Sequence, residues 1–196
     1  MITESVDRLG PLTVMIANAG IAPVGPTLEV SNDFVKEILN VNFMGVWNCY
    51  THAARQMLAQ GPVPRGSITG YKILGAASIA AYKPTPLLSA YSASKAAVRN
   101  LTQVFAIEMA PHNISVNCYS PGIVGTTMWE KIDEGMGKVH GRPRGYMLEK
   151  FGEGAAMGRV SVPEDVAKVV GGFLCGPDSE FVTGQNIVVD GGIVFP

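Results

Sequence analysis

The sequence predicts an α/β fold built on a buried parallel sheet. Short continuous apolar runs, such as 12–17 and 72–77, are typical of strands that are covered on both faces. Long segments whose apolar residues recur three and four positions apart, such as 90–110, are typical of the helices that cover such a sheet.

Size and composition indicate one globular domain without membrane or nucleic-acid partners. The chain has 196 residues, 47% of them apolar, and a formal charge of −1. Lysine and arginine are scattered instead of forming a basic stripe, and no apolar run has the length of a membrane span. The N-terminus is too polar for a signal peptide. The widely separated Cys49, Cys118 and Cys175 indicate reduced core thiols, disfavour a metal site and predict a cytoplasmic protein.

The first sixty residues predict a helix tail, a strand and a long helix. Residues 1–9 are amphipathic and are ended by the Gly-Pro that follows them. The strand at 12–17 is followed by a turn at Asn18-Ala19-Gly20. Ser31 has the residue type of a helix N-cap, and 32–59 carries a long apolar stripe.

Two features interrupt or follow that long helix. Asn42 lies in its interior, where an asparagine more often faces solvent. The segment 60–67 is dense in Gly and Pro and predicts a surface loop.

Tyr91 and Lys95 are four residues apart at the head of the helix 90–110, so their side chains share one helix face. A cation about 4 Å from a phenol, at an effective dielectric of about 20, contributes roughly 4 kcal/mol, or about three pKa units. That shift brings a tyrosine into the range of general acid–base chemistry. Ser78 follows the strand 72–77 and can face the head of this helix across a crevice. Taken alone, such a Tyr/Lys pair is more often an ordinary surface pair.

The C-terminal half predicts two more strands and a helix. The run 114–119 is strand-like, and Pro121-Gly122 turns the chain after it. Pro163 opens a helix to about residue 174, with acids near its positive end. The last strand is predicted at 185–190.

Asn18-Ala19-Gly20, Asn42, Ser78, the Tyr91/Lys95 pair and Pro121-Gly122 occur in the order and approximate spacing of the short-chain dehydrogenase/reductase family. The chain strongly resembles this family over essentially its whole length. The resemblance implies a Rossmann-like, doubly wound parallel sheet. It also implies that 60–67 is an insertion, because the spacing from Asn42 to Ser78 is longer than the family usually shows.

The resemblance implies a catalytic centre of Ser78, Tyr91, Lys95 and Asn42. Tyr91 would transfer the proton, Ser78 would hydrogen-bond the substrate oxygen, and Lys95 would lower the tyrosine pKa and bind the nicotinamide ribose. Asn42 would complete a proton relay through a water at a helix kink.

The resemblance also implies where NAD or NADP would bind. Asn18 and Gly20 would line the adenosine side of the cofactor cleft, and Tyr91 and Lys95 would contact the nicotinamide ribose. Val124 and Thr126 would meet the nicotinamide carboxamide. No metal is implied.

Between 129 and 157 the helical period is lost and Gly and charged residues accumulate. A long irregular segment in a compact domain is usually functional. We expect a substrate lid at about 126–158, with Met128 and Trp129 either as pocket walls or as ordinary packing residues.

By comparison with the family, the sequence lacks the first three strands, the Gly-rich turn that receives the pyrophosphate, and the residue that selects NAD or NADP. We therefore expect a single partial domain, 1–196, truncated at its N-terminus. The strand 12–17 would then be an exposed edge. Either the natural protein is longer or the chain is an impaired enzyme.

The first functional hypothesis is an oxidoreductase that transfers hydride between NAD(P)(H) and a ketone or secondary alcohol. The segments 72–80, 91–95 and 121–129 resemble the branch of diacetyl (acetoin-forming) reductases and butanediol dehydrogenases. That branch implies a small diketone, acyloin or diol, with a ketoreductase of polyketide-like metabolites as an alternative.

The second hypothesis is a non-catalytic remnant that assembles with full-length partners. Family members are commonly homodimers or homotetramers built through two long helices, here 32–59 and 90–110. A hydrolase using Ser78 or Ser92 is disfavoured, because no Gly-x-Ser-x-Gly elbow is present and the three histidines have no partnering pattern.

Overall fold

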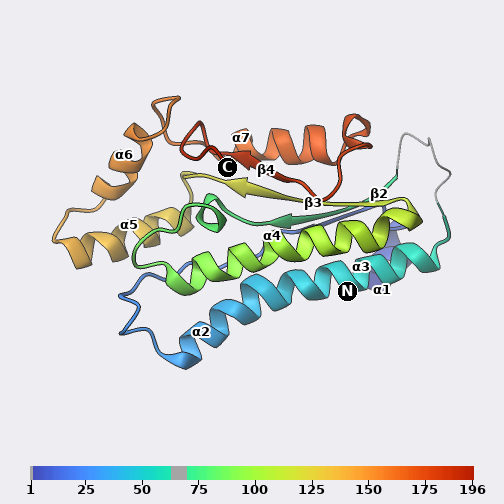
Figure 1. Ribbon diagram of the computed structural model, residues 1–196, viewed down its shortest axis with the longest axis horizontal. Coiled ribbons are helices and arrows are strands. Elements are labelled where there is room, and N and C mark those ends of the chain that lie inside the picture. The colour runs from blue at the N-terminus through green and yellow to red at the C-terminus, as the bar shows by residue number, and fades with distance from the viewer. Residues whose placement is uncertain (1, 63–69) are drawn as a thin grey trace.

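The computed structural model describes residues 2–62 and 70–196 (Figure 1). The predicted 60–67 insertion therefore lies mostly outside the described residues. The described strands are β1 (Val14–Ala17), β2 (Tyr71–Ala76), β3 (Ile114–Pro121) and β4 (Asn186–Val189). The main helices are α1 (Ile2–Leu9), α2 (Asn32–Leu39), α3 (Gly45–Ala59), α4 (Ser89–Met109), α5 (Thr127–His140), α6 (Tyr146–Glu153) and α7 (Pro163–Ala167).

The described strands form one sheet in the order β1-β2-β3-β4, and every neighbouring pair is parallel. The four strands predicted at 12–17, 72–77, 114–119 and 185–190 are thereby confirmed, with small shifts of their ends. Because parallel strands point the same way, the segments that follow β1, β2 and β3 all emerge at one edge of the sheet. In Figure 1 the arrowheads of the strands point toward α5 and α6.

Helices cover both faces of the sheet, as a doubly wound α/β fold requires (Figure 1). Side chains along β2 alternate between the two faces. Tyr71 and Ile73 pack into a core with α3 and α4, whereas Leu74 and Ala76 pack against Val170 beyond α7. Both faces of β2 are buried, which explains why its sequence is continuously apolar from Ile73 onward.

The contact between β2 and α3 depends on a glycine. Tyr50 of α3 is fully buried, and its hydroxyl lies 2.9 Å from the Thr102 hydroxyl of α4. A Cβ on Gly75 would collide with the Tyr50 hydroxyl. Only glycine at this position lets the helix approach the strand so closely.

The segment predicted as one helix at 32–59 is interrupted by a π-helical turn, Asn40–Met44, between α2 and α3. Ser31 caps α2 as predicted, with its hydroxyl accepting the Phe34 N–H at 3.2 Å. A π turn widens the helix by one residue and redirects the side chains around it. Asn42 lies in this turn and is fully buried.

The prediction of an irregular segment at 129–157 is wrong, because α5 and α6 occupy most of it. Its glycines serve close packing: a Cβ on Gly135 would lie 2.8 Å from Val24, and one on Gly137 would lie 2.9 Å from the Arg142 carbonyl. Buried Asp133 of α5 accepts the N–H groups of Gly145 and Leu148, which fixes the start of α6.

Within the described residues, β1 pairs on one side only, with β2. Its residue Ile16 is 42% exposed. The prediction that the 12–17 strand is an edge is therefore confirmed for the part of the chain that the structure describes. None of the helices described there is long and apolar enough to cross a membrane.

Candidate active site

A cavity of about 670 Å³ opens at the edge of the sheet where the parallel strands end. The segments after β1, β2 and β3, the head of α4, and parts of α5, α6 and α7 line it. Nine residues predicted from the sequence lie on its wall: Asn18, Gly20, Ser78, Tyr91, Lys95, Val124, Thr126, Met128 and Trp129.

Ser78 and Tyr91 meet at this cavity. Ser78 follows β2 in an extended conformation, and its hydroxyl accepts the Ala80 N–H at 3.1 Å. Burial raises the pKa of Tyr91, and the neighbouring Ser78 hydroxyl lowers that pKa by less. The predicted approach of a strand end to a helix head is thus present in the structure.

Lys95 lies one turn after Tyr91, and its side chain reaches a main-chain carbonyl of the sheet. Its side chain is buried, and Nζ donates to the Ala76 carbonyl at 2.8 Å. The same nitrogen lies 5.7 Å from the centroid of the Tyr91 ring. Burial lowers the pKa of Lys95 to about 8. The expected lowering of the tyrosine pKa is not seen in this structure: the pKa of Tyr91 is raised, because withdrawal from water outweighs the effect of the Ser78 hydroxyl.

Asn42 ties three segments together beside Lys95. Its Oδ1 accepts the Ile21 N–H at 2.8 Å, and its Nδ2 donates to the Ile21 carbonyl at 2.9 Å and to the Ser94 hydroxyl at 3.1 Å. A Cβ on Gly20 would lie 3.3 Å from both Asn42 Oδ1 and Lys95 Nζ. The asparagine therefore holds the turn after β1 against α4, close to the lysine.

Asn18 and Tyr119 form a polar contact across the cavity wall. The Tyr119 hydroxyl donates to Asn18 Oδ1 at 2.6 Å, which joins the ends of β1 and β3. Both residues line the cavity. Burial raises the pKa of Tyr119, so this phenol remains a hydrogen-bond donor at ordinary pH.

The chain after β3 is held at the cavity by main-chain bonds. Val124 forms a parallel bridge with Ser161, and the Thr126 hydroxyl donates to the Val124 carbonyl at 3.2 Å. Val124 and Thr126 are half-buried and both face the cavity.

The wall opposite the sheet is apolar. Met128, Trp129 and Ile132 of α5 pack with Leu88 and with Phe151 of α6. The rings of Trp129 and Phe151 meet edge to face, with centroids 5.6 Å apart. Met128 and Trp129 therefore both pack and line the cavity, which combines the two roles the sequence had left open.

Comparison with known proteins agrees with this geometry. A family model described as enoyl-(acyl carrier protein) reductase matches residues 1–194. A short-chain dehydrogenase/reductase of Armillaria gallica is 43% identical over 100% of this chain and 70% of its own length. The chain belongs to the short-chain dehydrogenase/reductase family.

Two further relatives of the same family have more specific names. An L-2,3-butanediol dehydrogenase of Corynebacterium glutamicum is 45% identical over 99% of this chain and 72% of its own length. A diacetyl reductase [(S)-acetoin forming] of Staphylococcus epidermidis is 38% identical over 100% of this chain and 73% of its own length. The resemblance to this branch of the family is thereby confirmed.

The fold also matches a solved member of this kind. A gluconate 5-dehydrogenase from Burkholderia cenocepacia, in complex with NADP and tartrate, superimposes with a TM-score of 0.82 at 26% identity. The match covers 98% of this chain and 68% of that structure.

Several residues of this short-chain dehydrogenase/reductase site were missed from the sequence. Tyr119, Leu88 and Phe151 line the cavity, and Ser94 receives the Asn42 amide. Ser94 could have been found from the sequence, because it lies three residues after Tyr91 on the same helix face. In the structure its hydroxyl donates to the Tyr91 carbonyl at 2.7 Å. Phe151 could not, because only the folding back of α6 brings it to the wall.

Proposed function

We propose that the chain is an NAD(P)-dependent oxidoreductase that interconverts a small ketone and a secondary alcohol, within the range of diketones, acyloins and vicinal diols. The observation that carries the proposal is that Ser78, Tyr91 and Lys95 line one cavity at the end of the parallel strands. Two hydroxyls that share one point on the wall can bind a single substrate oxygen.

The residues present fit the nicotinamide half of the cofactor. The Lys95 ammonium, the Tyr91 hydroxyl, the Thr126 hydroxyl and the main chain at Val124 border one continuous space. Asn18 and Gly20 border the same space from the end of β1 and would face the adenosine side. When bound, the nicotinamide supplies or takes up a hydride.

The raised pKa of Tyr91 favours proton donation at neutral pH. A protonated phenol can donate to a carbonyl oxygen as that oxygen becomes an alcohol. Ser78 accepts a hydrogen bond from Ala80, and in the substrate complex its own hydrogen would be donated to the substrate oxygen. Asn42 holds the turn after β1 beside Lys95, and we propose that a water at this helix kink would complete the proton relay from the lysine.

The cavity wall suits a small substrate with apolar carbons next to its oxygen. Met128, Trp129, Ile132 and Phe151 surround the space opposite Tyr91. The names of the butanediol and diacetyl relatives support a vicinal diol or diketone. The same apolar wall leaves a secondary-metabolite ketoreductase as the alternative.

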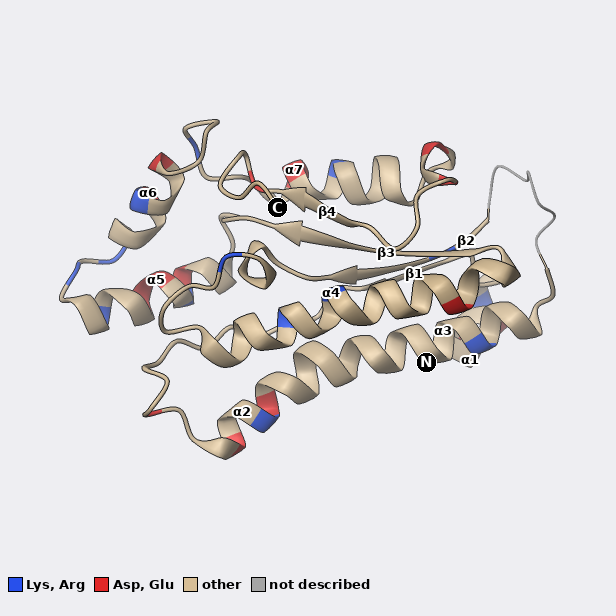
Figure 2. Cartoon of the chain, viewed as in Figure 1, with Lys and Arg blue, Asp and Glu red and all other residues tan. Residues whose placement is uncertain are grey.

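A second candidate function is a non-catalytic assembly partner, and an apolar surface on α3 and α4 provides the contact that it requires. Trp47, Val104 and Ile107 are 40%, 47% and 76% exposed on these helices. Figure 2 shows few charged residues along α3 and α4 and many on α5 and α6. We propose that this surface forms a homodimer or homotetramer contact, which an active enzyme and an assembly partner would share.

Titration with NADH and with NADPH separates the two functions. Trp129 lines the cavity and Trp47 lies outside it, so Trp47→Phe leaves Trp129 as the fluorescent reporter. An oxidoreductase gives saturable quenching with at least one nucleotide. No saturation with either would reject the enzyme proposal and leave assembly.

Replacing Tyr91 by Phe tests the chemistry. We expect diacetyl reduction to fall by about 10²- to 10⁴-fold, because the proton donor is lost. Nucleotide affinity should stay nearly unchanged, because the ring and Lys95 remain. Reduction at the wild-type rate by Tyr91→Phe would show that another group donates the proton.

A further inference from the structure

The chain leaves the sheet after β3, and at Ser161 it returns to lie beside Val124. Ser161 donates its N–H to the Ile123 carbonyl at 3.0 Å and accepts the Gly125 N–H at 2.9 Å. The Ser161 hydroxyl also donates to the Ile123 carbonyl, at 2.7 Å. The main chain at 123–125, which carries Val124 into the cavity, is therefore held by a single residue on the returning segment.

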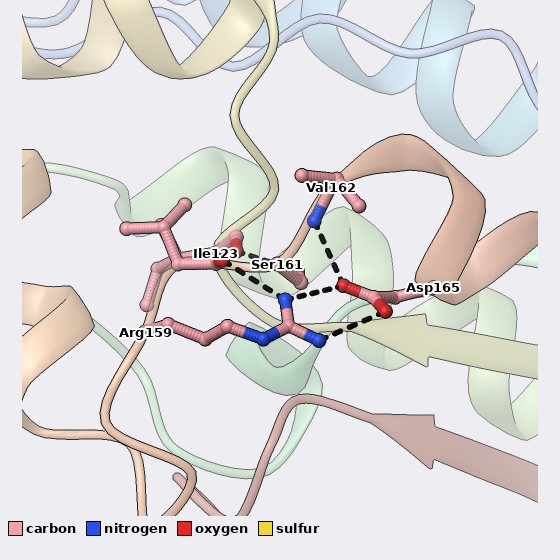
Figure 3. Close-up of polar contacts among 6 residues, drawn as sticks. Ile123, Arg159, Ser161, Val162 and Asp165 are labelled. Carbon is pink, nitrogen blue, oxygen red and sulfur yellow. Dashed lines mark hydrogen bonds and ion pairs between the residues drawn. The ribbon is translucent and has the colours of Figure 1, made fainter.

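An ion pair closes the turn around that residue (Figure 3). Arg159 precedes Ser161, and its Nη1 and Nη2 donate to the two carboxylate oxygens of Asp165 at 2.6 and 3.0 Å. Asp165 also accepts the Val162 N–H at 2.9 Å, and Arg159 donates to the Val160 carbonyl at 3.2 Å. Every residue from 159 to 162 is thus bonded either within this turn or to the chain after β3.

The geometry of this pair is of the strong kind. Two parallel N–H···O bonds from one guanidinium fix both side chains in orientation as well as in distance. The carboxylate also lies in the first turn of α7, where the helix dipole favours negative charge. Arg159 holds the pKa of Asp165 down, at about 2, so the pair stays charged at ordinary pH.

We propose that Arg159 and Asp165 are positioning residues for the nicotinamide end of the cavity. They fix Ser161, and through it the main chain on both sides of Val124, relative to α7. The inference rests on the proposed function, since it assigns this main chain to the cofactor. Pro163 and Val166 of α7 line the same cavity, so the pair sets the spacing of two walls.

A second ion pair, in the segment between Val124 and Ser161, provides a matched control. Arg144 and Glu130 join the segment before α6 to α5 at 3.2 Å, with side chains 71% and 56% exposed. Neither residue bonds the 123–125 segment or lines the cavity in the described structure. Arg144→Met therefore removes an arginine–carboxylate pair without changing Arg159, Asp165 or Ser161.

The first measurement is amide hydrogen exchange in the free protein. Arg159→Met should speed exchange at Gly125 and Ser161 by about two- to fivefold, the scale of one exposed ion pair. Asp165→Asn keeps an acceptor for the Val162 N–H and should produce the same change. Ile73 of the central strand is the internal reference for global destabilisation. Unchanged Gly125 and Ser161 exchange, or an equal change in Arg144→Met, would overturn the proposal.

The second measurement is nucleotide affinity, followed by the quenching titration with NADH and NADPH. Arg159→Met and Asp165→Asn should raise the dissociation constant about two- to fivefold while the KM for diacetyl stays constant. Arg159→Lys keeps the charge but loses the two parallel hydrogen bonds, so its dissociation constant should lie between those of the wild type and Arg159→Met. If exchange changes but affinity does not, the pair is only structural and the proposal fails. If the wild type binds neither nucleotide, the proposed function fails. This inference then fails too, whatever the exchange rates show, because no cofactor is left for Arg159 and Asp165 to position.

Discussion

Tyr91 and Lys95 are withdrawn from water by the same cavity wall, and burial shifts their pKa values in opposite directions. The neutral phenol is favoured at Tyr91, and the neutral amine is favoured at Lys95. At neutral pH Tyr91 is therefore a neutral proton donor, whereas Lys95 is still mostly protonated but loses its proton at a lower pH than an exposed lysine does.

The pH dependence of stability tests the burial of Lys95. Its pKa is about 8 in the folded chain against an ordinary 10.5, so the unfolded chain binds more protons between these values. The free energy of unfolding should therefore rise with pH across this window, by up to about 3 kcal/mol relative to Lys95→Met. Urea unfolding of both proteins at neutral and alkaline pH measures this difference. A difference that does not vary with pH would place Lys95 in a wetter site than described.

The residues of the candidate site could be predicted, but their electrostatics could not. The spacing of Tyr91 and Lys95 on one helix face, and the position of Ser78 after a strand, follow from helix and sheet geometry. The direction of the Lys95 ammonium does not, because it is set by the Ala76 carbonyl on another element. The Lys95 ammonium is hydrogen-bonded to this main-chain carbonyl, and the spacing along α4 could not predict that partner.

At the scale of elements, the fit of α3 on β2 depends on the missing side chain of Gly75. Gly75→Ala should destabilise the chain by about 1–3 kcal/mol, because its Cβ would overlap the buried Tyr50 hydroxyl. Tyr50→Phe removes that hydroxyl and should restore part of the loss in the double variant. Thermal and urea unfolding measure both changes.

Gly171 gives the control for this substitution. A Cβ there meets nothing within 4 Å, so Gly171→Ala should be neutral or slightly stabilising. Equal losses from Gly75→Ala and Gly171→Ala would mean that backbone effects, and not the contact with Tyr50, cause the change.

The strands were predicted better than the helices, for a physical reason. A strand buried on both faces shows itself as a continuous apolar run, as 73–77 does. In α5 the glycines Gly135 and Gly137 hide the helical period, because their packing partners, Val24 and Arg142, come from other segments. The π turn at Asn42 was likewise invisible, because its bonds run to Ile21 and Ser94.

At the scale of the molecule, the apolar surface on α3 and α4 predicts self-association. Ile107→Glu places a charge on that surface and should lower the association constant by at least about tenfold, because the buried charge would have no partner. Sedimentation velocity over a range of concentrations measures this change. Leu28→Glu, at a fully exposed leucine outside these helices, is the control. Equal association in wild type and Ile107→Glu would exclude this surface as the contact.

The parallel pairing of the strands and the covering of both faces could be predicted through the family resemblance, and the structure confirms them. The placement of α5 and α6 against the 20–24 turn could not, because it depends on contacts between segments more than a hundred residues apart.

The adjacency of Val124 and Ser161 has a consequence for how such proteins diversify. A segment whose two attachment points are already hydrogen-bonded neighbours can be lengthened, shortened or exchanged at little entropic cost to the sheet beneath. We therefore expect that exchanging 126–158 for the corresponding segment of a relative would change the proposed substrate preference while Ser78 and Tyr91 keep their positions.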